Sequence, residues 1–203
     1  MTDNNKPGIT FSETMSGGLM LGETDCREGS KAARHSGDLF AMHADVVIDD
    51  IDRFIADKAH AGALGGTIDY VPFGLGIPCH SGKFNLFSPT GNPLMNYMIY
   101  ELGFEHQGQE YYVAGHKEVK DDPGFDLWSD TTTLYTKLHR GSDSSAPVVG
   151  AGILTLGVSD LIKLVASMRV TNDECVSDKT ETLASFGRFF LGELWDTYAP
   201  KLG

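Results

Sequence analysis

The stretch NYMIYELGFEHQGQEYYVAGHKEV, residues 96–119, decides the fold class of this 203-residue chain. Gln107 and Gly108 fit a two-residue hairpin turn, which brings the segments on either side together as antiparallel strands. The facing pairs are then Leu102–Val113, Phe104–Tyr111 and Glu105–Glu110. One face of this hairpin is apolar and the other carries acids, as in a sheet that packs on a core from one side only. The stretch therefore predicts a half-buried antiparallel sheet, although the facing glutamates weaken its register.

Period-two patterns and turn residues continue on both sides of the hairpin. The further strands that we expect cover residues 8–15, 39–49, 66–74, 82–88, 129–138 and 146–156. Residues 16–38 are rich in Gly, Ser and charge, and we expect a long surface loop there, of the kind that often carries function. Many strands with short connections predict a mainly β chain: an antiparallel β-barrel or sandwich, of which a calycin-like barrel is one form.

Three segments change to helical spacing. Residues 49–62 fit a short helix after an Asp cap, and residues 158–168 fit a second helix capped by Ser159. The last helix begins with a capping-box pattern at Asp178 and Glu181. Its apolar stripe consists of Leu183, Phe186, Phe190, Leu194 and Tyr198, broadened by Leu191 and Trp195. We expect this C-terminal amphipathic helix to cover an opening or a flank of the sheet.

Length and composition limit the number of domains and the classes of partner that the chain can have. Its length and an apolar fraction of 41% fit one domain, which we place at residues 9–203 after a flexible tail at residues 1–8. A net charge of −12 argues against nucleic acid as a partner, because counterion release needs clustered Lys and Arg. No apolar run is long enough to span a membrane, and three Cys without CxxC spacing fit reduced thiols. We therefore expect a cytoplasmic protein.

The segment DLWSDTTTLYTKLH, residues 126–139, is the first candidate site. Its three threonines are β-branched and favour a strand, and the aspartates before them can bind backbone N–H groups at a turn. Trp128 would close the end of the sheet or contact a ligand. Asp130 would be a general base at the mouth of a pocket if burial raised its pKa. The start of a strand explains the same residues without any chemistry and is the simpler interpretation.

Glu13 and Glu118 complete the candidate catalytic set. In a strand, Ser12 and Thr14 share one face and Glu13 lies on the other, where it could be a pocket acid. A strand end followed by a glycine turn explains this segment as well. The candidate ligand-binding residues are Trp128, Tyr97, Tyr100, Met98 and His116. Ordinary core packing is the alternative for most of these aromatic and methionine side chains.

No metal or cofactor site is expected from the sequence. The acidic clusters at residues 45–52 and 121–126 lack the spacing of an EF-hand, and the histidines form no HExxH pair. Neither a dinucleotide-binding GxGxxG nor a phosphate-binding GxxxxGK[ST] loop occurs. His43 and His116 lie in expected strands and could converge inside a barrel, with a structural role for each as the alternative.

Several phrases, taken in order, resemble an accessory segment of large bacterial flavoprotein oxidoreductases of the glucose-methanol-choline type, which include cholesterol-oxidase-like chains. These phrases are ITFSETMSG (9–17), IDRFIADKAHAGALGGTI (51–68), GKFNLF (82–87), MIYELGF (98–104), GHKEVKDDPGFDLWSDTTTLYTKL (115–138), GILTL (152–156) and FGRFFLGELWDTY (186–198). The FAD-binding glycine fingerprint of such enzymes is missing here. The resemblance therefore implies a stand-alone accessory domain near lipid or sterol metabolism, without the oxidase activity.

Two classes of function follow from these observations. The first is a non-catalytic module that binds a lipid- or sterol-like small molecule, or docks onto a partner oxidoreductase of lipid metabolism. An enclosed apolar lumen would favour ligand binding, and a solid core would leave docking alone. The second is a small cofactor-free isomerase or cyclase in which a confined carboxylate moves a proton, with Glu13, Glu101, Glu118 and Asp130 as the acids to test. A homo-oligomer that uses the acidic surface is a weaker alternative.

Overall fold

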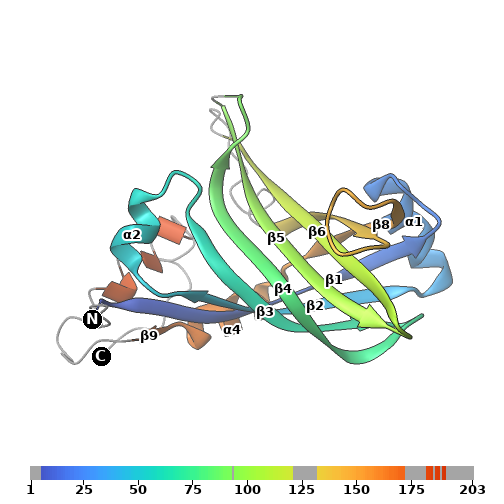
Figure 1. Cartoon of the computed structure of the whole chain (residues 1–203), viewed down its shortest axis with the longest axis horizontal. Helices are drawn as coiled ribbons and strands as arrows, with labels where there is room; N and C mark the ends of the chain where they lie inside the picture. Colours follow the sequence, from blue (N-terminus) through green and yellow to red (C-terminus); the bar gives the residue numbers. More distant parts are fainter. Residues whose placement is uncertain are drawn as a thin grey trace.

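A computed structural model describes residues 6–92, 94–120, 132–171, 182–184, 186–187 and 189–190. Eight antiparallel strands close into a barrel, because β1 pairs with β2 on one side and with β8 on the other. These strands are β1 (Gly8–Leu21), β2 (Leu39–Ile48), β3 (Ala61–Tyr70), β4 (Gly74–Pro89), β5 (Met95–His106), β6 (Gln109–Lys120), β7 (Thr133–His139) and β8 (Val148–Thr155). The expected antiparallel β architecture is thus confirmed, as a closed barrel (Figure 1).

The hairpin of β5 and β6 has the register that the sequence predicts. Leu102 pairs with Val113, and Gln107 and Gly108 form the turn. Both turn residues have positive φ angles, 52° and 74°, which match the right-handed twist of the two strands. Glu105 does face Glu110, and the apolar pairs on the inner face offset this unfavourable pair on the outer face.

Alternating residues fill the barrel interior. On β1, the inward positions include Ile9, Phe11, Glu13 and Met15, and on β2 they include Phe40. The inward apolar side chains of all eight strands belong to one continuous cluster, and most of them expose no surface to water. At those positions the barrel is therefore filled by side chains, as small barrels generally are.

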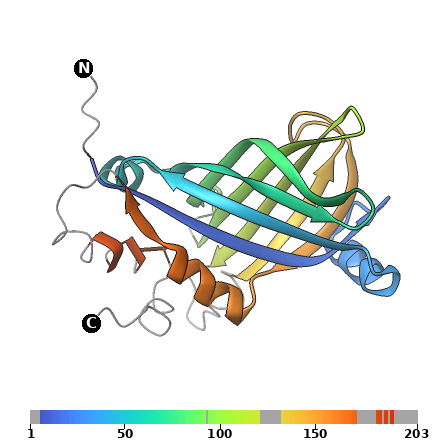
Figure 2. The ribbon, with the colours of Figure 1, turned by 90° about the horizontal axis from the view of Figure 1, so that it is seen from below.

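Helices lie at both ends and on one flank of the barrel (Figures 1 and 2). Helix α1 (Cys26–Ser36) packs on β1 and β8, and α2 (Ile51–Ala56) lies at the opposite end. Helix α4 (Val158–Ser167) runs along the outside of β1 and leads into the short strand β9 (Arg169–Thr171), which pairs with the start of β1. None of the helices in the described ranges is long and apolar enough to cross a bilayer.

The prediction of a long loop at residues 16–38 is wrong. β1 continues to Leu21, and α1 follows, with the Asp25 carboxylate accepting hydrogen bonds from two backbone N–H groups and Gly37 in the left-handed conformation at its end. The expected Ser159 cap is also wrong, because Gly157 precedes α4 and makes no side-chain cap bond. Helix α1 thus has local caps at both ends and packs on β1 and β8, and α4, which lacks a side-chain cap, packs on β1.

The described part of the C-terminal segment is helical at residues 182–184, 186–187 and 189–190. Phe186 and Phe190 are buried against Phe11 of β1, with ring centroids 6.2 and 5.0 Å apart. Phe186 also contacts Phe54 of α2. The segment therefore closes the α2 end of the barrel, as the amphipathic pattern predicts. The expected cap at Asp178 and Glu181 and the stripe beyond Phe190 lie outside the described residues.

Candidate functional site

A buried polar trio crosses the interior of the barrel. Glu13 comes from β1, and Tyr100 and Lys117 come from β5 and β6 on the opposite wall. Lys117 Nζ lies 2.7 Å from Glu13 Oε1, and the Tyr100 hydroxyl donates a 2.7 Å hydrogen bond to Glu13 Oε2. Lys117 Nζ also lies 3.4 Å from the Tyr100 hydroxyl oxygen and 4.7 Å from its ring centroid. Each member thus has polar partners within the trio.

Burial makes this trio energetically costly. The side chains of Glu13 and Lys117 are 0% and 2% exposed, and Tyr100 is buried as well. Burial and the neighbouring Glu13 carboxylate raise the pKa of Tyr100 well above its usual value, so the phenol stays protonated and donates to Glu13. An ion pair in such surroundings offsets its desolvation only through mutual contact and further hydrogen bonds. Buried charged groups of this kind are candidates for a functional site, and they also occur in structural ion-pair networks.

Strand alternation explains how the sequence builds the trio. Met98, Tyr100 and Leu102 face inward from β5, and register places Lys117 opposite Met98 and Gly115 opposite Tyr100. Of the predicted residues, the structure brings Glu13 and Tyr100 into direct contact and places Met98 in the adjoining core. Lys117 was not predicted. The available signal was a lysine on the apolar face of a hairpin whose turn fixes its register.

A second group of predicted residues gathers on the outer face of the barrel. The His116 ring lies between Tyr97 and Tyr135, with centroids 4.7 and 5.7 Å away, and its Nε2 is 4.0 Å from Glu118 Oε1. Burial lowers the pKa of His116, an effect that Glu118 partly counteracts. Tyr97 and Met98 are neighbours on one strand, so the predicted ligand-binding set is divided between the two faces of the sheet.

A small pocket adjoins this outer group. It holds about 250 Å³ and is lined by the start of α1 and by β6 and β7, including Cys26, Arg27, His116, Glu118, Tyr135 and Lys137. Its lining mixes both signs of charge, and burial raises the pKa of the Cys26 thiol, which keeps it protonated. The pocket is too small and too polar for a lipid-sized molecule.

A larger cleft of about 770 Å³ lies beside α2 at the closed end of the barrel. Its apolar walls include Val47 and Ile48 of β2 and Phe54 of α2. Its rim is charged and consists of Asp49, Asp50, Arg53 and Asp57. Phe54 contacts Phe84 and Phe186, so the cleft borders the aromatic cluster that closes the barrel. Its volume is in the range of ligand-binding sites.

Several predictions about sites are corrected, and two of the predicted residues lie outside the described ranges. His43 and His116 do not converge inside the barrel, because both occupy outward positions on β2 and β6. Asp130 and Trp128 lie outside the described residues. Glu101 is outward on β5 and accepts a 2.8 Å hydrogen bond from Tyr112. Within the described ranges, no cluster of three or more His, Cys, Asp or Glu side chains is arranged to hold a metal ion.

Comparisons with models of protein families, with curated proteins and with solved structures find no match to this chain. The arrangement of the side chains themselves is therefore the basis for any functional assignment.

Proposed function

We propose that this chain is a non-catalytic barrel that binds one small hydrophobic molecule with a single polar group, of the lipid or sterol kind. The observation that carries the proposal is a continuous series of aromatic contacts from the α2 cleft to the buried trio. Phe54 borders the cleft and contacts Phe84 at 6.5 Å, and Phe84 contacts Tyr100 at 5.2 Å. Ligand sites combine an apolar lining with a few polar groups that fix orientation, and this series has both.

Phe186 and Phe190 occupy the place where the apolar body of a ligand would lie. Their rings contact Phe11, Phe54 and Phe84, which are inward or cleft-facing residues of the barrel and of α2. The described inward side chains expose almost no surface to water, so the enclosed lumen that would favour ligand binding is not observed among them. A ligand therefore enters only when these two rings withdraw. The ligand then packs against the same apolar side chains in place of the two rings.

The test uses two fluorescent probes, an NBD-labelled sterol and an NBD-labelled fatty acid, titrated with the full chain. We expect saturable enhancement of fluorescence at one probe per chain for at least one of them. The Phe186→Ala/Phe190→Ala variant should bind that probe at least about tenfold more tightly, because the competing rings are gone and their apolar packing no longer has to be broken. Native mass spectrometry of the purified protein would detect a hydrophobic molecule that co-purifies.

Ala63→Trp provides a blocking variant, because Ala63 is exposed and lines the cleft. The new indole should fill the cleft and abolish binding while the melting temperature stays within a few degrees. Ala166→Trp is its matched control, since Ala166 is an exposed alanine on α4 and lies outside the cleft lining. Equal binding by both tryptophan variants, or no saturable binding of either probe, would contradict the proposal.

Docking onto a partner oxidoreductase is the other form of the non-catalytic proposal. It is supported by exposed apolar side chains at one end of the barrel, where Leu39, Val71 and Leu75 are 61%, 57% and 77% exposed. The Val71 N–H donates to the Leu39 carbonyl, and Val71 and Leu75 flank the turn between β3 and β4. A variant with all three changed to Ser should keep probe binding and lose association with the partner.

A small enzyme that moves a proton is the second candidate, favoured by the burial of Glu13 beside a hydroxyl and an ammonium group. A confined carboxylate of this kind can act as a base without a cofactor. 5-Nitrobenzisoxazole is a suitable probe, because loss of its C3 proton breaks the N–O bond and releases a coloured phenolate. A rate above background that disappears in Glu13→Gln would support an enzyme, and a rate unchanged by that substitution would exclude Glu13 as the base.

A further inference from the structure

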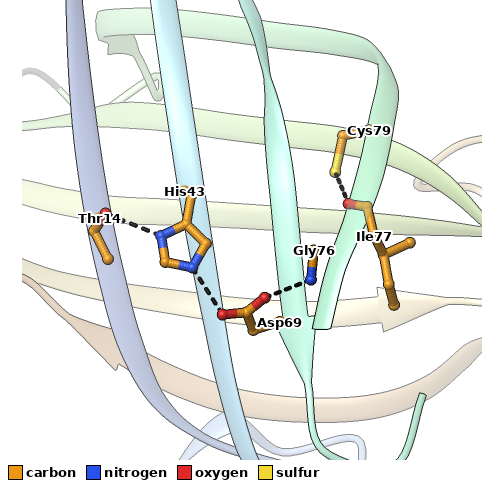
Figure 3. A network of polar contacts seen from close by, with 6 residues as sticks. All are labelled: Thr14, His43, Asp69, Gly76, Ile77 and Cys79. Atoms are coloured by element: carbon orange, nitrogen blue, oxygen red, sulfur yellow. Dashed lines mark hydrogen bonds and ion pairs between the residues drawn. The ribbon is translucent and has the colours of Figure 1, made fainter. Parts of the chain in front are cut away.

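A hydroxyl, an imidazole and a carboxylate lie in series on the outer face of β1, β2 and β3 (Figure 3). Thr14 Oγ1 is 3.1 Å from His43 Nδ1, and His43 Nε2 is 3.0 Å from Asp69 Oδ2. The backbone N–H of Gly76 donates a 2.6 Å hydrogen bond to the other oxygen of Asp69. Thr14 and His43 are directly paired across the two strands, and Asp69 is a diagonal neighbour of His43.

The direction of these hydrogen bonds follows from the carboxylate. The Gly76 N–H and then His43 lower the pKa of Asp69, so its carboxylate is ionised at neutral pH and only accepts hydrogen bonds. His43 Nε2 must therefore carry the hydrogen. In the neutral imidazole, Nδ1 then has a free lone pair, and it accepts the hydrogen bond from the Thr14 hydroxyl. This tautomer is the one that a triad of hydroxyl nucleophile, imidazole base and orienting carboxylate requires.

Neighbouring hydroxyls on the same face of β1 have different partners. The Thr10 hydroxyl donates to the backbone carbonyl of Val46 at 3.0 Å, and the Ser12 hydroxyl donates to Asp45 at 2.6 Å. Thr14 is the hydroxyl of this row whose partner is an imidazole. Its site is accessible, because Thr14 is only partly buried and the His43 side chain is 40% exposed.

We propose that Thr14, His43 and Asp69 form a site for acyl transfer from activated esters. Thr14 Oγ attacks the carbonyl carbon of the ester, and His43 Nδ1 takes the hydroxyl proton. The bond from that carbon to the leaving oxygen, or to the sulfur of a thioester, breaks. His43 returns the proton to the leaving alcohol or thiol, and the acyl group stays on Thr14. Water then cleaves the acyl-threonine by the same route and releases the acid.

The surroundings limit the substrate class. Backbone N–H groups next to Thr14 and His43 belong to the β1–β2 ladder and are not directed at a developing oxyanion. Without such stabilisation, an acyl donor needs a good leaving group, such as an aryl ester or a thioester. Asp45 and Asp69 lie on the same face, so uncharged or cationic acyl donors are favoured over anionic ones.

The test uses p-nitrophenyl acetate and peptide mass spectrometry of the full chain. We expect a burst of p-nitrophenol and an acetyl group on Thr14. Thr14→Val, which keeps the shape and removes the hydroxyl, should abolish the adduct, and Thr14→Ser should keep it. His43→Gln and Asp69→Asn should each slow its formation by about a hundredfold, the scale of general-base assistance.

Thr10→Val is the matched control, because it removes a hydroxyl of the same row that donates to a carbonyl oxygen. It should leave acetylation of Thr14 unchanged. Peptide mass spectrometry distinguishes an acetyl group on Thr14 from acetyl groups on surface lysines. If Thr14, His43 and Asp69 had only a structural role, acetylation would be confined to such lysines and would be the same in all variants. Absence of acetyl-Thr14, or its formation at the same rate in His43→Gln, would overturn the proposal.

Discussion

Glu13 and Lys117 form an ion pair across the barrel, with 2.7 Å between Glu13 Oε1 and Lys117 Nζ and almost no exposure of either side chain. The first prediction is that Lys117→Met destabilises the protein strongly, because it leaves the Glu13 charge buried without its partner. Removing one member of a buried pair costs about 3–5 kcal/mol. Urea unfolding of the variant and of the wild type, followed by circular dichroism, measures the difference.

Two further variants make this prediction specific. Lys163→Met removes an exposed lysine that pairs with Asp160 at 2.9 Å, and it should cost about 1 kcal/mol or less. The double variant Glu13→Leu/Lys117→Met removes both charges and should recover most of the stability that Lys117→Met removes. A destabilisation below about 1 kcal/mol in the single Lys117 variant would mean that the pair is hydrated in solution.

The second prediction concerns Gly29, the fourth residue of α1. Gly→Ala inside a helix normally stabilises by about 1 kcal/mol. At this position a methyl group would overlap the carbonyl oxygen of Ala151 on β8, so α1 would have to move away from the barrel. We therefore expect Gly29→Ala to destabilise by about 1–3 kcal/mol. Thermal unfolding measures this change, and Gly65→Ala is the control, because its methyl group would meet open space.

The third prediction is a pH dependence that comes from His116. Burial lowers its pKa in the folded state below the ordinary value of 6.5, so on acidification the unfolded chain takes up this proton first. Stability is therefore lost as the pH falls below about 6.5. The urea midpoint should fall between pH 7.5 and pH 5.5, and His116→Gln should reduce that fall.

Glu118→Gln tests the same effect from the other direction. The Glu118 carboxylate partly counteracts the lowering of the His116 pKa, so its removal should increase the loss of stability at pH 5.5. An equal fall of the midpoint in the wild type and in both variants would show that other groups control the acid response.

The sequence was informative where side-chain period and turn chemistry agree. In β5 and β6, the two residues at the turn fix the register, and the apolar pair Leu102–Val113 fixes which face is inward. The same register already places Lys117 on the inner face. A lysine there requires a buried acid, and Glu13 is the acid on the apolar face of β1.

The segment after Met15 could not be predicted because three of its glycines, Gly17, Gly18 and Gly29, act by close approach and not as turn residues. A side chain at Gly17 would overlap the carbonyl oxygen of Ile153, and one at Gly152 would overlap that of Gly18, so these glycines let β1 and β8 close the barrel. Helix α1 likewise packs through Gly29, Ser30 and Ala33, and these small residues give no apolar stripe to recognise.

The fourth prediction separates two tyrosine hydroxyls that both donate to a glutamate. The Tyr100 hydroxyl donates to Glu13 at 2.7 Å inside the barrel, and the Tyr112 hydroxyl donates to Glu101 at 2.8 Å on the outer face. Tyr100→Phe leaves a buried carboxylate oxygen without its donor, and we expect a loss of about 1–3 kcal/mol. Tyr112→Phe leaves a carboxylate that water can reach, so its cost should be about 1 kcal/mol or less. Urea unfolding of the two variants gives the comparison directly. Equal losses would mean that water replaces the Tyr100 hydroxyl inside the barrel, and the trio would then be an open site that a polar ligand group could reach without displacing Phe186 and Phe190.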